Sequence, residues 1–71
     1  MIKDELALQI ANKLKAIRLG KNLSQIKLAE MADIHFTYYS QIERAVRKDV
    51  SVRILKKITD VLNITVNDVI Y

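Results

Sequence analysis

The chain has 71 residues, of which 51% are hydrophobic, with one glycine, no proline, one histidine and no cysteine. This length fits one domain, the lack of cysteine excludes disulfides and thiolate metal sites, and a single histidine excludes a four-ligand zinc site of the usual kind. The formal net charge is +4, which favours an anionic partner such as nucleic acid, although a solvated basic surface has the same composition.

With one glycine and no proline, the chain has few residues that interrupt helices, so we expect a compact all-α domain that occupies the whole chain, residues 1–71. No apolar run is as long as a membrane span and no signal-peptide pattern opens the chain, which predicts a soluble cytoplasmic protein. Paired catalytic acids, a phosphate-binding glycine loop and a metal cluster are all missing from the sequence. We therefore expect neither an enzyme nor a cofactor nor a small-molecule ligand.

The first predicted helix runs from Asp4 to Leu19. Asp4 and Glu5 lie in its first turn, where carboxylates interact favourably with the helix dipole. Its apolar stripe has members three and four residues apart, namely Leu6, Ile10, Leu14 and Ile17. Gly20 follows at the position where a left-handed C-terminal cap is expected.

Residues 24–44 contain two short helical patterns joined by a tight turn. Ser24 is a suitable N-cap for the first helix, and Asp33 tolerates the left-handed backbone that the turn requires. The small inner face of the first helix consists of Leu28, Ala29 and Ala32. The second helix begins near Phe36 and places Tyr39 and Ile42 on its inner face. Its other faces carry Thr37, Ser40, Gln41 and Arg44.

The outward side chains of this second helix have the chemistry that recognises base edges in a DNA major groove. Gln41 is the sharpest candidate, because its amide can donate to and accept from adenine at once. Thr37 offers a hydroxyl and a methyl group, and Phe36 either contacts a thymine methyl or packs back on the domain. His35 is suited to cap the helix or to contact a phosphate. Tyr38 is expected to be exposed, with its hydroxyl near a phosphate.

The same stretch resembles the helix-turn-helix of phage-repressor (Cro-like, XRE-type) transcriptional regulators. The residues that carry the resemblance are Gln25, Ala29, Ile34, Tyr39, Ile42, Glu43 and Arg44. Within that family, the chain is most similar to controller proteins of restriction–modification systems, on His35, Thr37, Tyr38 and the run Ile42-Glu43-Arg44. The resemblance extends from roughly Leu8 to Ile70 and implies a five-helix, lambda-repressor-like fold.

The DNA surface can now be predicted residue by residue. The expected base contacts are Phe36, Thr37 and Gln41. The expected contacts to the DNA backbone are Gln25, His35, Tyr38, Ser40, Arg44, Arg47 and Lys48. For Gln25 a capping or solvated role remains an alternative, and the basic residues after the second helix are equally compatible with a solvated loop. The resemblance also implies an ion pair between Arg18 and Glu43 that ties the first helix to the second helix of the motif.

The chain departs from the family pattern at several positions. Asp33 and Ala45 stand where glycine is usual, and the segment 45–50 is about one residue longer than the common spacing. Ile26 and Met31 replace polar residues, so each is either exposed or covered by the tail or a partner. These departures make the path after the second helix less predictable than the helices themselves.

The C-terminal third predicts a helix from Val52 to Leu62 with Ser51 as its N-cap and Asn63 at its C-terminus. Thr65 and Asp68 have the spacing of a capping box for a short last helix. The apolar members of that helix are Val66, Val69, Ile70 and Tyr71. They either complete the chain's own core or form a two-fold interface, and the resembling controllers, which dimerise through their C-terminal helices, favour the interface.

The resulting hypothesis is a transcriptional regulator that binds double-stranded DNA as a homodimer, with half-sites about 34 Å apart. The alternative is a protein-binding module of the same fold, an antitoxin or an adaptor, that uses Ile26, Met31 and Tyr71 as an apolar patch.

Overall fold

The structure is a computed structural model that describes residues 5–47 and 50–70. Throughout these two ranges the regular secondary structure is helical. The helices are α1 (Glu5–Gly20), α2 (Gln25–Ala32), α3 (Phe36–Glu43), α4 (Val52–Leu62) and α5 (Val66–Ile70). The predicted five-helix all-α fold is therefore confirmed. None of the helices in the described ranges is long and apolar enough to cross a bilayer.

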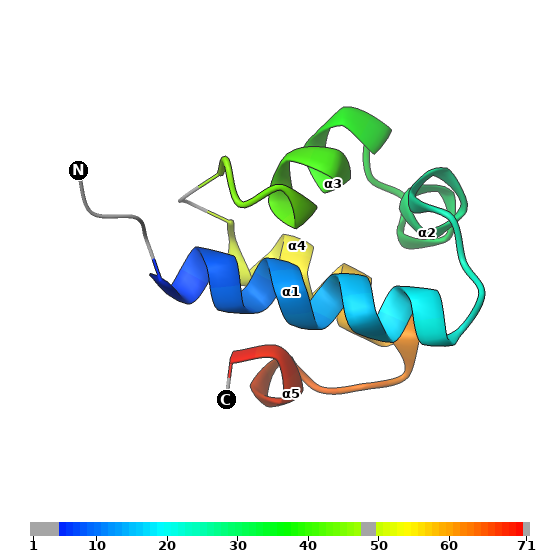
Figure 1. Cartoon of the computed structure of the whole chain (residues 1–71). Coiled ribbons are helices and arrows are strands. Elements are labelled where there is room, and N and C mark those ends of the chain that lie inside the picture. Colours follow the sequence, from blue (N-terminus) through cyan, green and yellow to red (C-terminus); the bar gives the residue numbers. More distant parts are fainter. Residues whose placement is uncertain (1–4, 48–49, 71) are drawn as a thin grey trace.

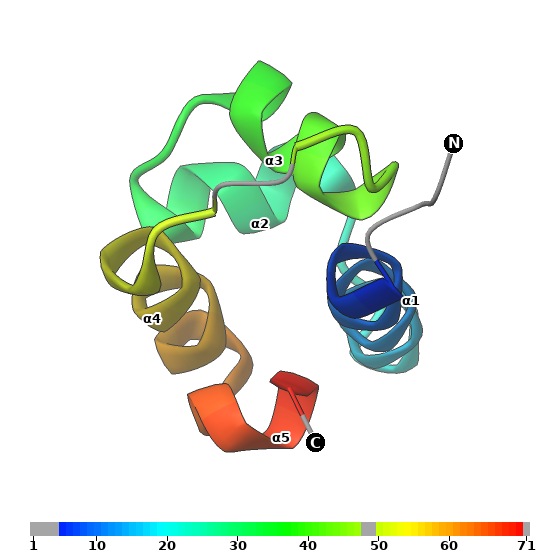
Figure 2. The same ribbon diagram turned by 90° about the vertical axis from the view of Figure 1, so that its left-hand side faces the viewer.

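The five helices surround one core. In Figures 1 and 2, α2 and α3 lie at one end of the molecule, α5 lies at the opposite end, and α1 and α4 form the two sides between them. The largest completely buried side chains include Leu14 of α1, Leu28 of α2, Tyr39 of α3, Ile58 of α4 and Val69 of α5. Every helix therefore contributes to the same core, and the outer face of α3 points away from it.

Four helices end in the same way. At each end one residue adopts a left-handed backbone conformation, with φ near 60°: Asn22, Asp33, Ala45 and Asn63. At each of them, the left-handed residue donates its N–H to the carbonyl three residues earlier, and the next residue donates to the carbonyl five residues earlier, over 3.0–3.2 Å. This pattern is the Schellman motif, which usually employs glycine. Within the described residues, the left-handed positions are all occupied by other amino acids.

Most of the predicted caps are confirmed. Ser24 accepts a hydrogen bond from the Lys27 N–H at 3.0 Å, and Ser51 accepts one from the Ile54 N–H at 3.1 Å. The predicted cap at Gly20 is wrong. Gly20 is the last residue of α1, and the left-handed residue is Asn22, whose short polar side chain tolerates that conformation.

The buried face of α1 differs from the predicted stripe. Ile10 and Leu14 are buried as expected, but Leu6 is 49% exposed, whereas Ala11 and Arg18 are buried. With 3.6 residues per turn, a face that contains Ala11, Leu14 and Arg18 leaves Leu6 at its margin. The predicted helix start at Asp4 lies outside the described residues.

The last helix completes the core of its own chain. Thr65 and Asp68 form the predicted capping box, with the Thr65 N–H 2.8 Å from Asp68 Oδ2 and the Asp68 N–H 3.3 Å from Thr65 Oγ1. Val69 is completely buried, so its assignment to a dimer interface is wrong, because no surface of it remains for a partner. Val66 and Ile70 are half-buried against the core, and Tyr71 lies outside the described residues.

Candidate nucleic-acid interface

The inner face of helix α3 is buried in the core, and its outer face is exposed to solvent. Tyr39 is fully buried and Ile42 nearly so, as predicted. The outer residues Phe36, Thr37 and Arg44 are exposed, and Ser40 and Gln41 are half-buried. Because Thr37, Ser40, Gln41 and Arg44 are three or four residues apart, they line one side of the helix. This side presents hydroxyl, amide and guanidinium groups together.

The turn before α3 sets the position of its first residues. Asp33 is left-handed, and Ile34 packs partly buried against the core. His35 follows in an extended conformation, and its Nδ1 accepts a hydrogen bond from the Thr37 N–H at 3.2 Å. The imidazole is therefore the N-cap of α3, which was one of the two roles predicted for it.

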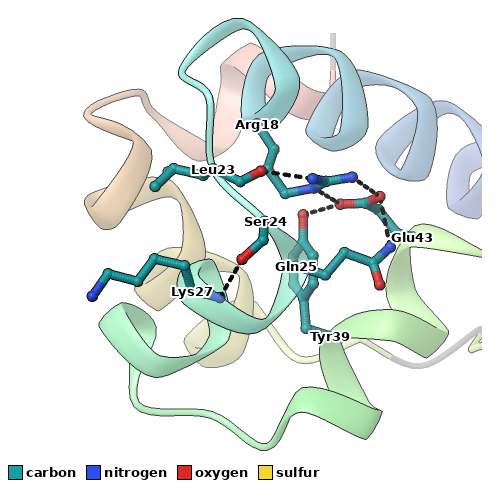
Figure 3. A network of polar contacts seen from close by, with 7 residues as sticks. All are labelled: Arg18, Leu23, Ser24, Gln25, Lys27, Tyr39 and Glu43. Carbon is teal, nitrogen blue, oxygen red and sulfur yellow. Dashed lines mark hydrogen bonds and ion pairs between the residues drawn. The ribbon is translucent and has the colours of Figure 1, made fainter.

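A buried carboxylate joins three helices. Arg18 of α1 donates to Glu43 of α3 twice, from Nε to Oε2 at 2.6 Å and from a terminal nitrogen to Oε1 at 2.9 Å, which is the predicted ion pair. Gln25 of α2 donates from Nε2 to Oε1 of the same carboxylate at 3.0 Å, and the Tyr39 hydroxyl donates to its Oε2. A further Arg18 nitrogen donates to the Leu23 carbonyl at 2.7 Å. Figure 3 shows these contacts.

The protonation of this cluster follows from its surroundings. Burial acts to raise the pKa of Glu43, but hydrogen bonds from Arg18, Tyr39 and Gln25 outweigh it, so the pKa of the carboxyl is lowered. The hydrogen bond to Glu43 raises the pKa of Arg18. Burial, together with the hydrogen bond to the carboxylate, raises the pKa of Tyr39 well above its usual range. At neutral pH the cluster thus contains an ionised pair and a protonated phenol.

The cluster also determines how Gln25 is presented. Gln25 is the first residue of α2, directly after the Ser24 cap, and is half-buried. Its amide nitrogen is directed to Glu43, and this orients the side chain beside the N-terminus of α2, where backbone N–H groups favour anions. The predicted phosphate contact and the structural contact are compatible in this position.

The segment after α3 folds back onto the helix. Arg47 donates from Nε to Gln41 Oε1 at 2.9 Å, and its guanidinium carbon lies 4.1 Å from the centre of the Tyr38 ring. Tyr38 is half-buried and packs against the core, so the prediction of an exposed side chain is wrong. The ring is held between the core and the cation of Arg47. Lys48 lies outside the described residues.

Sequence reasoning missed two features of this surface. The Tyr39–Glu43 hydrogen bond could have been predicted from the sequence, because residues four apart on a helix are neighbours. The hydrogen bond from Arg47 to Gln41 could not have been predicted from the sequence, since it depends on the backbone path after α3. The two departures Ile26 and Met31 are exposed, at 55% and 51%, so the described part of the C-terminal tail does not cover them, and cover by a partner stays a prediction.

Comparisons with known proteins agree with this geometry. A helix-turn-helix family model matches residues 14–69. The control protein C.BamHI of Bacillus amyloliquefaciens is 40% identical over an alignment of 68 residues that covers 94% of this chain and 83% of that protein. The structure of the restriction-modification controller protein C.AhdI from Aeromonas hydrophila has a TM-score of 0.83 at 27% identity, covering 89% of this chain and 94% of that one. The structure of SinR, the master regulator for biofilm formation, in complex with DNA has a TM-score of 0.78 at 34% identity, covering 82% of this chain and 92% of that one.

Proposed function

The chain belongs to the helix-turn-helix family and is a DNA-binding regulator homologous to restriction–modification controller proteins, and we propose that it binds a pseudo-palindromic operator as a homodimer. The observation that carries this proposal is the pairing of an open, polar face on α3 with a buried ion pair that fixes α3 against α1. A helix held in this way can enter a major groove without losing its orientation.

The roles of the individual side chains follow from where each one lies. Thr37 and Phe36 are exposed at the start of α3, the part of a recognition helix that reaches base edges, and Gln41 lies one turn further on. The side chains proposed to contact the DNA backbone are Gln25, His35, Tyr38, Ser40, Arg44 and Arg47, together with Lys48, which is proposed from the sequence alone. Cations at the rim of the groove supply affinity for any sequence, and the net charge of +4 supports the same role.

The proposed dimer must place both α3 helices on the same side of the DNA. Since α5 lies opposite α3, an interface made by α5 alone would point the two α3 helices away from each other (Figure 1). The interface is therefore proposed on the side of the molecule that faces the viewer in Figure 2, which carries the starts of α1 and α4, the end of α3 and the end of α5. Leu6, Val46 and Val52 lie in these segments or just after them, and they are 49%, 61% and 71% exposed. We define these three residues as the apolar flank, and Ile70 at the end of α5 extends it.

The proposed mechanism is occupancy of a promoter by the dimer in the cytoplasm, with regulation through protein concentration. Dimerisation couples operator binding to concentration, because only the dimer contacts both half-sites. A controller of a restriction–modification system, or a repressor of its own gene, requires no ligand for this behaviour.

The test is selection of bound duplexes from a random DNA pool at near-physiological salt. A pseudo-palindrome with half-sites about one helical turn, or about 34 Å, apart is the expected product. Gln41→Ala is expected to relax the preference at one base position by about 1–3 kcal/mol, whereas Arg44→Ala is expected to weaken binding to all sequences and to flatten the salt dependence. No enrichment of any sequence by the unaltered protein would refute the proposal.

A protein-binding module is the second candidate, because Ile26 and Met31 on α2 are exposed apolar side chains. An antitoxin or adaptor with this surface would bind a protein partner tightly and would be indifferent to DNA. Steep salt dependence of duplex binding would favour the regulator instead.

A further inference from the structure

We propose that Arg47 is a positioning residue that fixes the amide of Gln41, so that Gln41 presents its N–H₂ group to the base and recognises guanine in preference to adenine. This inference rests on the DNA-binding function proposed above. It concerns which base that function selects. The starting observation is the 2.9 Å hydrogen bond from Arg47 Nε to Gln41 Oε1.

The chemistry of arginine determines which way the amide points. A guanidinium has five N–H donors and no acceptor, so the amide atom that it contacts must be the oxygen. The N–H₂ group is attached to the same planar carbon and is directed away from Arg47. A free glutamine can turn either atom toward a base, whereas this one has its oxygen engaged.

The backbone explains why Arg47 reaches this position. The Schellman motif that ends α3 includes a hydrogen bond from the Val46 N–H to the Gln41 carbonyl at 3.1 Å. The main chain next to Arg47 is therefore tied to the same residue whose side chain Arg47 contacts. The guanidinium is also held over the Tyr38 ring, with 4.1 Å between its central carbon and the ring centre. Tyr38 and Gln41 are three residues apart on α3, so these two contacts of Arg47 move together with that helix.

The engaged oxygen changes the expected base. Recognition of adenine by glutamine needs both amide atoms, because adenine offers its N7 acceptor and its N6 amino donor. The Gln41 oxygen has two lone pairs, and Arg47 occupies one of them and holds the amide in place. The oxygen is therefore a weaker acceptor for the adenine amino group, whose positive edge the nearby guanidinium also repels. Guanine offers two acceptors, O6 and N7, on the same edge, and an N–H₂ group satisfies them without the oxygen. The adenine preference inferred for Gln41 from the sequence is thereby replaced by guanine.

The experiment is a selection from a random pool with four proteins of this chain. Gln41→Ala first identifies the base position that Gln41 contacts in the operator of the unaltered protein. Arg47→Met then removes the guanidinium but keeps an extended side chain, and Arg53→Met removes an equal charge from an exposed position on α4. Circular dichroism and thermal unfolding of each variant establish that it is folded.

The expected result has three parts. The unaltered protein selects guanine at the Gln41 position. Arg47→Met raises the adenine-to-guanine ratio there by about five-fold or more, since one base-specific hydrogen bond of about 1 kcal/mol or more is exchanged. Arg53→Met leaves the ratio unchanged, whatever it does to affinity.

Gln41→Glu gives a second test that does not alter Arg47. The substitution keeps an oxygen for Arg47 and replaces the donor group by an acceptor, so preference is expected to move from guanine to cytosine, whose N4 amino group donates. The inference is overturned if the unaltered protein selects adenine at this position, if Arg47→Met leaves the ratio as it was, or if Gln41→Glu still selects guanine. In each case the selected operator would still establish DNA recognition, whereas a pool with no enrichment would remove the proposed function itself.

Discussion

The carboxylate of Glu43 accepts hydrogen bonds from Arg18 of α1, Gln25 of α2 and Tyr39 of its own helix. Arg18 and Glu43 are 7% and 9% exposed, so little water is left to replace a lost partner. Each partner compensates the other for the loss of hydration that burial imposes. Substitution of either Arg18 or Glu43 is therefore expected to destabilise the fold.

Glu43→Gln leaves a buried guanidinium without its counter-charge. We expect a loss of about 3 kcal/mol in the free energy of unfolding, measured by urea denaturation, because a broken buried pair costs more than the intact pair contributes. The double variant Arg18→Met/Glu43→Leu is expected to be more stable than Glu43→Leu alone. An unchanged urea midpoint for Glu43→Gln would show that the ion pair does not support the fold.

The same cluster predicts how stability varies with pH. The folded-state pKa of Glu43 is below its ordinary value of 4.5, so its contribution is present above that value and is lost as pH falls through the folded pKa. The folded-state pKa of Tyr39 is above its ordinary value of 10.0, so its contribution is present below that value and is lost as pH rises beyond it. Thermal unfolding should show a plateau between these limits. Tyr39→Phe should flatten the alkaline decline.

At the scale of the helices, the four left-handed residues that follow helix ends differ in the free energy that their conformation costs. They are Asn22, Asp33, Ala45 and Asn63. Asparagine and aspartate visit the left-handed region with local help from their side chains, but alanine has no polar group to compensate its Cβ contacts. The end of α3 is therefore the most strained of the four. The rest of the motif there, with hydrogen bonds from Ala45 and Val46, is intact.

Ala45→Gly is expected to raise the free energy of unfolding by about 0.5–1 kcal/mol, because relief of the left-handed strain exceeds the added freedom of the unfolded chain. Ala16→Gly is the matched control, since Ala16 is exposed within α1 and should lose about 1 kcal/mol on the same chemical change. Opposite signs in chemical denaturation are the expected outcome. Equal losses would contradict the account of strain at Ala45.

The helices were predictable where their signals are local. Ser24 and Ser51 are caps because a hydroxyl at that position meets an N–H three residues later, and the sequence alone contains that spacing. The wrong prediction at Gly20 has a physical reason. Glycine permits a left-handed conformation but does not require it, and the helix ended two residues before the residue that adopts one, Asn22.

The positions of the candidate residues on α3 were predictable from the sequence, and the contacts that they make were less so. The outward set on α3 follows from helical spacing, but the bond between Gln25 and Glu43 joins residues 18 apart, and only the packing of α2 beside α3 brings them together. Arg47 was expected at a phosphate because a sequence displays its charge and not its return to Gln41. Burial of Val69 likewise depends on how α5 docks, and its apolar character alone fits a core or an interface.

At the scale of the whole molecule, the end formed by α2 and α3 and the end that carries α5 are opposite each other, and the side on which α1 and α4 begin lies between them (Figures 1 and 2). In the proposed dimer, two copies related by a two-fold axis along this direction would present both α3 helices to one duplex. The flank residues are exposed in the single chain, so a partner can cover them without unfolding either copy.

Val52→Lys is expected to convert the protein to a monomer, because Val52 is 71% exposed on the flank and a charge there would be buried against its symmetry mate. Ile26→Lys introduces the same charge at a 55% exposed position on α2 and should leave the dimer intact. Sedimentation equilibrium should give twice the 8.2 kDa chain mass for the unaltered protein and for Ile26→Lys. A monomer at high concentration for the unaltered chain would refute the dimer.

The carboxylate that joins α1, α2 and α3 affects how a destabilising mutation would change the activity of this protein in a cell. Because α3 is attached to the core through the same buried contacts that stabilise the domain, we expect the helix to loosen only when the domain unfolds. Mild destabilisation then lowers the dose of active molecules and does not broaden the set of promoters that each one occupies. Partial loss of function in this regulator would appear as reduced dosage at the correct genes.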